Sequence, residues 1–491
     1  MKRAGRHLRP RLRALTSSSL AGPVLTLLSG TVAAQALAYL ARPILTRLFA
    51  PEAFGLFAFF LAIITVLGTA SAGKYEDAIP VPERDRDAAG AAALAVMLSA
   101  LVTLLCLLFI PFRESLAALV GRPDVATLFI LVPAGVLIAA WSRVAELWLT
   151  RTHQFRSIAV ARAAQSGVAV PLQVVAGILA AGALGLVGGY LAGRMTALAG
   201  MAHAALRGDR LHAARGVLTV GTLRQVARRF RRFPAFSMPS GFLNNLSIQL
   251  PAFLLLAFFA PEVAGLYAIA HGTLAVPMHL LGSSVAQVFF SHAAEAHRRG
   301  TLGSMTSGVH ARLSAIGLFP LAAVAVAGPA AFAFVFGAEW REAGVYAQYL
   351  APWVFFVFLS SPLSNLFDVL DRQHRELQFN VVLTISRLAA LLAGAAIGSP
   401  RWSVALFAAV STIFWIGHTV WMLRWGGAKA GRALKKTGRH ALLAAPPLVL
   451  LLAAVLAGWG DAAVVGVLAI CAVLAYGILM RFEPDLLPRP S

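Results

Sequence analysis

The chain has 491 residues, of which 59% are hydrophobic and only 13% are charged. Soluble globular domains carry about 25% charged residues, so this composition excludes a soluble fold and indicates a protein embedded in a membrane. The net charge of +22 alone would allow a nucleic-acid partner, but the positions of the basic residues argue against one.

Apolar stretches of about 20 residues recur along the chain, and each is long enough to cross a hydrocarbon core about 30 Å thick. The stretches are continuous and do not alternate, which predicts an all-α polytopic membrane protein and not a β-barrel. About 14 transmembrane helices are predicted, at residues 20–41, 54–72, 88–110, 125–149, 158–181, 184–206, 236–259, 263–290, 313–336, 345–367, 379–398, 402–424, 441–459 and 463–480.

The basic residues lie mainly in alternate loops. Only six of the 42 Lys and Arg residues fall in the loops on one side of the predicted membrane, and the densest clusters on the other side lie within residues 2–13, 207–232 and 429–439. Because basic loops stay in the cytoplasm, both termini are predicted to be cytoplasmic. The same loops are expected to contact anionic membrane lipids, and no nucleic-acid partner is predicted.

Two short stretches, 210 residues apart, repeat one another. Residues 50–58 (APEAFGLFA) and residues 260–268 (APEVAGLYA) are identical at six of nine positions. Each begins a predicted span, where proline suits the first helical turn and glutamate lies at the positive end of the helix dipole. Gly55 and Gly265 occupy the same position in the two copies and are expected to let a neighbouring helix approach closely.

A weaker similarity relates residues 149–155 (LTRTHQF) to residues 370–376 (LDRQHRE). In both repeats six predicted spans separate the copies, which predicts two parallel six-helix lobes around a central cavity and transport by alternating access. The predicted parts are an N-lobe at 1–206, a linker at 207–235, a C-lobe at 236–424 and a C-terminal part at 425–491, which holds a basic loop, two more helices and a short tail.

The linker contains an amphipathic helix at residues 218–233. Leu223, Val226, Phe230 and Phe233 fall on one helical face, and the arginines lie largely elsewhere. Such a basic amphipathic helix is expected to lie along the cytoplasmic leaflet.

Five ionisable residues lie well inside predicted spans, where each charge costs about 2.5–3.5 kcal/mol: Arg143, Glu146, Arg162, Arg194 and Arg387. Arg143 and Glu146 are three residues apart on one helix and could neutralise each other. The other three arginines have no carboxylate nearby in the sequence, and a cavity lined by them would bind an anion such as phosphate. Arg162 lies close enough to the end of its span to extend to the interface instead.

Polar residues within spans add weaker candidates. Asn244, Asn245 and Gln249 could contact sugar hydroxyls in the cavity, or could form hydrogen bonds between helices. Glu146, with Arg143 beside it, is the candidate site for a coupling proton or Na⁺, although the neighbouring guanidinium would favour a permanently ionised carboxylate.

No catalytic residue, cofactor or metal site is predicted. Residues 68–75 (GTASAGKY) resemble a phosphate-binding loop but end in tyrosine where the motif requires serine or threonine. Every predicted periplasmic loop is short, which disfavours a membrane enzyme that builds glycans.

The N-terminal region resembles a known family. Residues 29–60 (SGTVAAQALAYLARPILTRLFAPEAFGLFAFF) and residues 73–88 (GKYEDAIPVPERDRDA) are similar to the Wzx-type polysaccharide-unit flippases of the multidrug/oligosaccharidyl-lipid/polysaccharide (MOP) exporter superfamily. The resemblance implies two six-helix lobes around a V-shaped cavity, with the last two helices peripheral. It also makes Arg42 and Lys74, which lie in the matching segments, candidate cavity or gate residues.

The resemblance implies a function as well. The substrate would be an undecaprenyl-diphosphate-linked oligosaccharide repeat unit, carried to the periplasmic leaflet for O-antigen, capsule or exopolysaccharide synthesis. The implied partners are membrane lipids and, in the same assembly system, a glycan polymerase and chain-length proteins. The arginines would bind the diphosphate, and the lobes would then reorient.

Three alternatives stay open. A lipid II flippase of the same superfamily would share the diphosphate, and a small-molecule exporter would share the fold but favour an acidic cavity for cationic drugs. A membrane enzyme of glycan assembly belongs to another class and would be expected to present a larger periplasmic loop.

Overall fold

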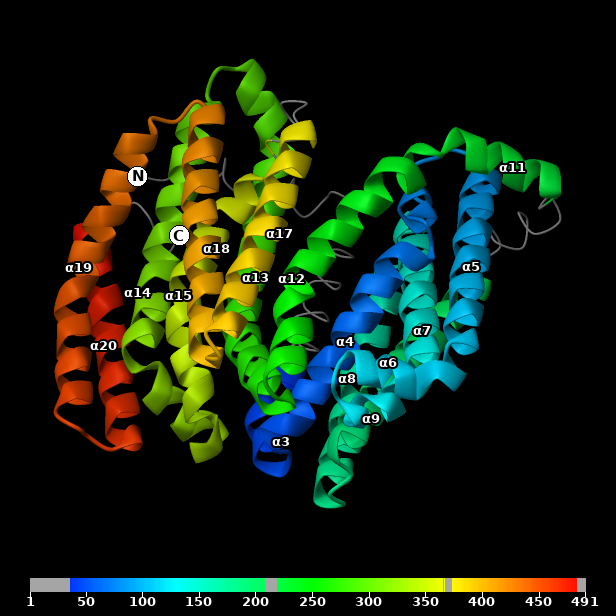
Figure 1. Ribbon diagram of the computed structural model, residues 1–491. Helices are drawn as coiled ribbons and strands as arrows, with labels where there is room; N and C mark the ends of the chain where they lie inside the picture. The colour runs from blue at the N-terminus through cyan, green and yellow to red at the C-terminus, as the bar shows by residue number, and fades with distance from the viewer. Residues whose placement is uncertain (1–35, 208–218, 365, 367–372, 484–491) are drawn as a thin grey trace, which may run out of the picture. The chain divides into compact units, whose positions relative to one another are not determined.

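The computed structural model describes residues 36–207, 219–364, 366 and 373–483, and these are almost entirely helical, with no strand among them (Figure 1). The all-α class is confirmed. The α-helices are α3 (Arg42–Leu48), α4 (Pro51–Ser71), α5 (Asp85–Leu108), α6 (Arg113–Leu119), α7 (Ala126–Arg151), α8 (Phe155–Ile178), α9 (Gly182–Leu206), α11 (Val220–Arg229), α12 (Met238–Phe258), α13 (Pro261–Arg298), α14 (Leu302–Phe336), α15 (Arg341–Ser360), α17 (Gln373–Ala396), α18 (Pro400–Trp425), α19 (Ala430–Leu456) and α20 (Asp461–Phe482). The shorter helical turns are η1 (Tyr75–Ala78), η2 (Ile110–Phe112), η3 (Pro123–Val125), η4 (Phe233–Ser237), η5 (Ala338–Trp340) and η6 (Ser361–Leu363).

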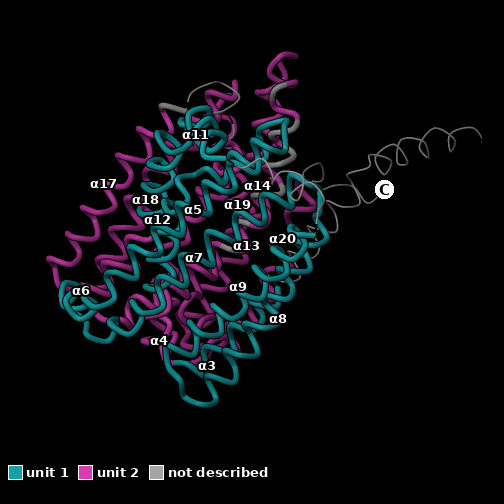
Figure 2. The backbone as a smooth tube through the Cα atoms, turned by 90° about the vertical axis from the view of Figure 1, so that its right-hand side faces the viewer, with its two compact units in different colours: residues 1–49, 59–246 teal, residues 50–58, 247–491 magenta. Residues whose placement is uncertain are grey.

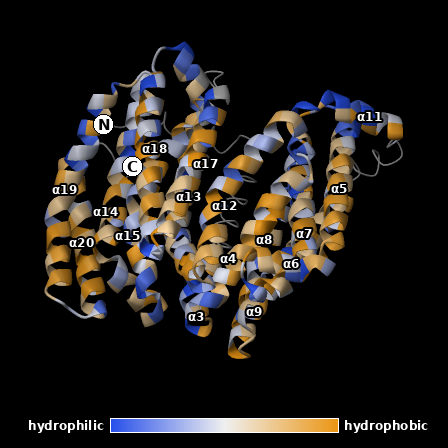
Figure 3. Ribbon diagram, viewed as in Figure 1, coloured by the Kyte–Doolittle hydropathy of each residue, from blue (hydrophilic) through white to orange (hydrophobic). Residues whose placement is uncertain are grey.

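Twelve segments among the described residues are long and apolar enough to cross a membrane, so the chain is a multi-pass membrane protein. Apolar residues cover these helices, and hydrophilic residues gather near helix ends and along α11 (Figure 3). The predicted span at 184–206 is present as α9 but is not among the twelve, because its glycines, Arg194 and His203 lower its hydropathy. The first predicted span, 20–41, lies mostly outside the described residues, so the count of 14 stays a prediction.

Three helices are longer than the spans predicted from hydropathy. Helix α13 ends at Arg298 instead of residue 290, α14 begins at Leu302 instead of residue 313, and α19 begins at Ala430 instead of residue 441. The additional turns are polar, since the hydropathy pattern marks where a helix leaves the hydrocarbon and not where it ends.

The chain divides into two compact units (Figure 2). The described residues of unit 1 are 36–49, 59–207 and 219–246, and those of unit 2 are 50–58, 247–364, 366 and 373–483. The chain passes from one unit to the other inside α4 and again inside α12. Each of these two helices therefore belongs partly to both units.

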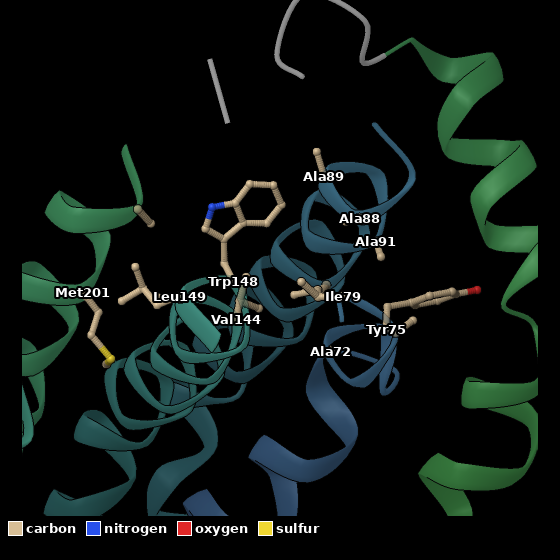
Figure 4. Close-up of a cluster of buried hydrophobic side chains, with 14 of the residues drawn as sticks. Ala72, Tyr75, Ile79, Ala88, Ala89, Ala91, Val144, Trp148, Leu149 and Met201 are labelled. Atoms are coloured by element: carbon tan, nitrogen blue, oxygen red, sulfur yellow. The ribbon is translucent and has the colours of Figure 1, made fainter. Parts of the chain in front are cut away.

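The core of unit 1 gathers α5, α7 and α9 around the segment that follows α4. Trp148 and Leu149 of α7 and Met201 of α9 are buried together with alanines of α5. Tyr75 of η1 and Ile79, which follows η1, belong to the same cluster (Figure 4). The alanines let the helices approach closely, and the burial of these apolar groups fixes the position of η1.

The apolar face of helix α11 packs on α5. Val226 is 1% exposed, and a Cβ atom at Gly90 of α5 would lie 2.9 Å from a Val226 methyl group. At its polar margin Arg229 donates to Asp87 of α5 at 2.7 Å. The sequence periodicity predicted the apolar face correctly, but α5 covers it, so α11 is part of unit 1.

Unit 2 contains α13–α15 and α17–α20. Helices α19 and α20 pack on α14 through a cluster that includes Phe319, Leu451, Val464 and Cys471. Cys471 is a buried free thiol that acts as a small apolar residue. The α19–α20 pair packs mainly on α14, also contacts α18, and carries exposed apolar side chains on its other side.

The two copies of the repeated stretch pack against each other within unit 2. A Cβ atom at Gly55 would overlap the carbonyl oxygen of Pro261, and a Cβ atom at Gly265 would overlap the carbonyl oxygen of Pro51. Each glycine thus lies against the proline carbonyl of the other copy, as expected where two equivalent segments cross at their equivalent glycines. The predicted close approach is confirmed, and each copy is the neighbour of the other.

The crossing makes both glycines sensitive to added volume. We expect Gly55→Ala and Gly265→Ala each to destabilise the protein by about 1–3 kcal/mol, because backbone carbonyls cannot move aside as a flexible side chain can. The measurement is the thermal unfolding midpoint of the purified protein in detergent.

Gly188→Ala provides the matched control, because Gly188 is also helical and no described atom outside its own helix backbone lies within 4 Å of the added methyl group. This change should leave the midpoint unchanged or raise it, since alanine favours the helix by about 1 kcal/mol over glycine. Equal midpoints for all three variants would contradict the crossing.

Candidate functional site

A cavity of about 230 Å³ lies within unit 1, at the end of α4. Its charged and aromatic lining residues are Lys74, Glu76, Arg143, Tyr190 and Arg194. They come from three places in the sequence: the segment after α4, the second half of α7 and the middle of α9. Three cations from separate elements thus converge on one cavity.

The backbone after α4 directs two of these side chains. Gly73 and Lys74 both adopt left-handed conformations, with φ of 59° and 61°. Glycine adopts this conformation freely, whereas for lysine it costs about 1–2 kcal/mol. The burial of Tyr75 and Ile79 in the unit 1 core offsets this cost, and it holds Lys74 and Glu76 at the cavity.

Asp77 connects two of the cations. Its carboxylate lies 3.1 Å from Nζ of Lys74 and 3.3 Å from Nη2 of Arg143. Lys74 also packs on α12, where a Cβ atom at Gly241 would lie 3.3 Å from its Cε atom. Glycine at this position leaves room for the lysine stem.

Glu146 is held between two arginines. Arg162 donates to its carboxylate at 2.8 Å, and Arg143 lies 3.7 Å from the same oxygen. The predicted pairing of Arg143 with Glu146 is confirmed. The expectation that Arg162 lacks a carboxylate partner is wrong, because α8 turns back along α7 and brings Arg162 beside a residue 16 positions earlier.

Arg194 is half-buried and makes no ion pair within the described ranges. Its guanidinium lies 5.9 Å from the ring centroid of Tyr190, one turn earlier on α9. Both residues line the cavity. Arg194 therefore presents a charge to the cavity that no acidic side chain of the described chain neutralises.

Of the predicted polar residues, Asn245 is closest to this site. Its amide donates to Oγ1 of Thr69 at 2.8 Å, and Thr69 lines the cavity. Asn244 is exposed, and Gln249 belongs to unit 2. The structure therefore brings one of the three predicted amides to the rim of the cavity.

Two other predicted residues lie elsewhere in the fold. Arg42 belongs to α3 and lies over the ring of Tyr39, with its guanidinium 4.2 Å from the ring centroid. It does not line the unit 1 cavity. Its proposed role as a gate residue stays a prediction.

Arg387 is enclosed in unit 2, where it is 3% exposed. Its Nε atom donates to Ser411 at 2.9 Å and its Nη1 atom donates to Ser247 at 3.2 Å. The guanidinium also lies over the rings of Trp353 and Phe407, 4.9 Å and 5.1 Å from their centroids. These contacts connect α12, α15, α17 and α18, and a role for Arg387 in substrate binding stays a prediction.

Sequence reasoning missed Glu76, Asp77 and Tyr190. The two acids follow the end of a span, where a charged residue is ordinary and does not by itself indicate a site. The signal that could have found them is the sequence KYED (74–77), which lies within the segment that resembles the flippases. Tyr190 could have been found from its position one helical turn before Arg194.

The described chain holds a larger cavity of about 680 Å³ in unit 2, lined in part by His297, Lys429 and Arg432. It lies where the loops between α13 and α14 and between α18 and α19 meet. The unit 1 cavity is the stronger candidate, because two of its charges, Arg143 and Arg194, lie on long helices of the bundle, where an uncompensated charge is costly and needs a functional reason.

The comparisons with known proteins agree with this fold. The model of the family described as "Polysaccharide biosynthesis protein" matches residues 44–345, which is more than half of the chain. The match includes all the residues of the unit 1 cavity.

The chain is also 24% identical over 311 residues to the succinoglycan biosynthesis transport protein ExoT of Rhizobium meliloti (strain 1021). The alignment covers 62% of this chain and 60% of that relative. The chain therefore spans less than two thirds of the length of the curated relative that it matches.

Solved structures show the same fold at low identity. The lipid II flippase MurJ in an inward closed conformation superposes with a TM-score of 0.70 at 12% identity, covering 93% of this chain and all of that one. An inward-facing multidrug resistance MATE family transporter of the MOP superfamily superposes with a TM-score of 0.62 at 16% identity, covering 82% of this chain and 96% of that one.

The fold is that of these membrane transporters, and the resemblance noted at residues 29–60 and 73–88 is confirmed. The chain belongs to the polysaccharide biosynthesis protein family.

Proposed function

We propose that the chain is a flippase for undecaprenyl-diphosphate-linked oligosaccharide repeat units. In this proposal it lies in the bacterial inner membrane with both termini in the cytoplasm. It moves the glycan from the cytoplasmic to the periplasmic leaflet by alternating access, and it is not an enzyme. The observation that carries the proposal is the convergence of Lys74, Arg143 and Arg194 on one cavity within unit 1.

The chemistry of the cavity suits a diphosphate. Guanidinium and ammonium groups form short, charge-assisted hydrogen bonds with phosphate oxygens, and these bonds strengthen where water is excluded. Asp77 and Glu146 hold Arg143 in place through ion pairs. Thr69 and Asn245 at the rim offer polar groups to the first sugar.

The relatives support a polysaccharide substrate over the alternatives. The family is one of polysaccharide biosynthesis, and the named relative from Rhizobium meliloti is a transport protein for succinoglycan synthesis. MurJ, whose fold the chain shares, is named as a flippase for lipid II. A lipid II flippase therefore stays the second candidate, and a cation exporter is disfavoured by the basic cavity. A glycan polymerase and chain-length proteins would take up the translocated unit.

The ion that drives transport would be H⁺ or Na⁺. Glu146 was the predicted coupling site, but two arginines already contact its carboxylate. A proton or Na⁺ could bind there only after both contacts loosen. Glu146 is therefore not proposed as the binding site of the coupling ion.

The first test of the proposal is ligand binding. We expect Lys74→Ala and Arg194→Ala each to weaken binding of a farnesyl-diphosphate-linked monosaccharide by about 10- to 100-fold, since a hydrogen bond to a charged group contributes about 1.5–3 kcal/mol. Isothermal titration calorimetry on the detergent-solubilised protein measures the affinity.

Arg156→Ala is the matched control for this test, because Arg156 is exposed at the start of α8 and does not line the cavity. It should bind the probe as the unmodified protein does. Wild-type affinity in both cavity variants would contradict the proposed site. Binding that tolerates these changes but requires the lipid II headgroup would favour the second candidate.

The second test asks whether Arg387 stabilises the fold or binds the diphosphate. We expect Arg387→Ala to lower the thermal unfolding midpoint, because it removes the partner of two buried serine hydroxyls and two aromatic faces. The folded fraction should still bind the diphosphate probe with wild-type affinity.

Arg312→Ala, at an exposed position on α14, serves as the control and should leave the midpoint unchanged. A stable Arg387→Ala protein that has lost the probe would instead place Arg387 in the binding site, as the sequence first suggested.

A further inference from the structure

Glu76 is buried in the unit 1 cavity without a full set of partners. It is 4% exposed, and its Oε2 atom has no hydrogen-bond partner among the described residues. It lies after the end of α4 and before α5, outside the membrane spans. Burial of an ionised carboxylate without a partner is costly, so such a group tends to hold a proton.

The charged groups around Glu76 are engaged with other residues. Lys74 and Arg143 both pair with Asp77, the next residue along the chain. Arg194 lines the same cavity beside Tyr190. The pKa of Glu76 is raised mainly by burial and further by Asp77, while Lys74 and Arg143 oppose the rise.

The charged residues at the start of α5, which packs on η1, have hydrogen-bond partners other than Glu76. Helix α5 begins with Asp85, Arg86 and Asp87, which contact Arg151, Thr222 and Arg229 respectively. The turn η4, which also packs on η1, contains no titratable residue. Burial therefore has the largest effect on the protonation of Glu76, and Asp77, Lys74 and Arg143 modify it. An anion in the cavity would add to these effects.

The charge balance of the cavity depends on this one carboxyl. The cavity and the ion pairs joined to it contain four cations and three acids, namely Lys74, Arg143, Arg162 and Arg194 with Glu76, Asp77 and Glu146. With every acid ionised the sum is 4 − 3 = +1, and with Glu76 protonated it is 4 − 2 = +2. A diphosphate bonded to a lipid at one end and a sugar at the other carries one negative charge on each phosphate, about two in all.

We propose that Glu76 links diphosphate binding to the uptake of one proton. The inference rests on the proposed function. A proton from solvent bonds to Oε2 of Glu76 as the diphosphate enters, and the resulting hydroxyl donates a hydrogen bond to a phosphate oxygen. When the diphosphate leaves, the O–H bond breaks and the proton returns to solvent. The linkage sets how occupancy varies with pH and is not by itself a source of energy for transport.

The sign of the pH dependence follows from the charge. An anion in the cavity stabilises the protonated carboxyl, so the pKa of Glu76 is higher in the bound state than in the empty state. Affinity is therefore greatest below the empty-state pKa, and it falls as pH rises from that value to the bound-state pKa. For one linked proton the fall is at most about tenfold per pH unit.

The test uses a probe whose own charge is constant. A farnesyl-diphosphate-linked monosaccharide keeps one charge on each phosphate from about pH 5.5 to about pH 8.5, unlike inorganic pyrophosphate. Titration calorimetry of the full chain in detergent should show affinity falling with pH, and should show up to one proton taken up when two buffers of different ionisation enthalpy are compared.

Glu76→Gln mimics the protonated carboxyl. It should bind the probe at every pH as tightly as the unmodified protein binds at low pH, with no proton uptake. Glu83→Gln makes the same chemical change at an exposed position of the same loop and should keep the pH dependence of the unmodified protein.

The outcomes separate the two proposals. Failure of the unmodified protein to bind the probe at any pH contradicts the proposed function, and the inference falls with it. Binding with an equal pH slope in the unmodified protein and in Glu76→Gln overturns the inference alone. If Glu76→Gln does not fold, binding by the unmodified protein without proton uptake overturns the inference instead.

Discussion

Charged side chains in a hydrocarbon layer need compensating charges or hydrogen bonds, and the site in unit 1 depends on how the chain meets this constraint. Asp77 pairs with Lys74 and Arg143, and Glu146 is held by Arg143 and Arg162. The network positions its cations accurately and still leaves positive charge exposed in the cavity. Such partial compensation costs less than isolated arginines would, and it keeps the cavity attractive to an anion.

The same constraint is met differently in unit 2. Arg387 is satisfied by two serine hydroxyls and two aromatic rings, with no carboxylate in contact among the described residues. Its guanidinium connects helices of unit 2. Arg194 and Arg387 were both predicted well inside spans, and they differ in their surroundings, since Arg194 lines the unit 1 cavity and Arg387 is buried among neutral side chains.

Much of the fold could be predicted from the sequence, because a long apolar helix is stable in a membrane whatever packs beside it. The helices followed from hydropathy, and the close approach at Gly55 and Gly265 followed from the repeat at residues 50–58 and 260–268. The sequence did not predict that each copy is the neighbour of the other. The partners of individual side chains could not be predicted in this way. The pairing of Arg162 depends on how α8 packs on α7, and the cover of α11 depends on the alanines and glycine of α5.

The candidate site was predicted in part. Lys74 came from the family resemblance and Arg194 from its depth in a span, and both line the cavity. Glu76 was missed because its burial comes from the tertiary core around η1 and not from its position in a span. The sequence places Glu76 in a loop between two spans. Its burial follows from the packing of Tyr75 and Ile79, which the sequence pattern does not show.

The most direct test of the flippase assignment follows the lipid-linked glycan in cells that lack this protein. Surface polysaccharide and the pool of lipid-linked repeat units should be measured together, with the leaflet determined by accessibility to an added glycosidase. The assignment predicts loss of the surface polysaccharide and accumulation of complete repeat units in the cytoplasmic leaflet. Unchanged polysaccharide, or its loss without any complete lipid-linked unit, would contradict it.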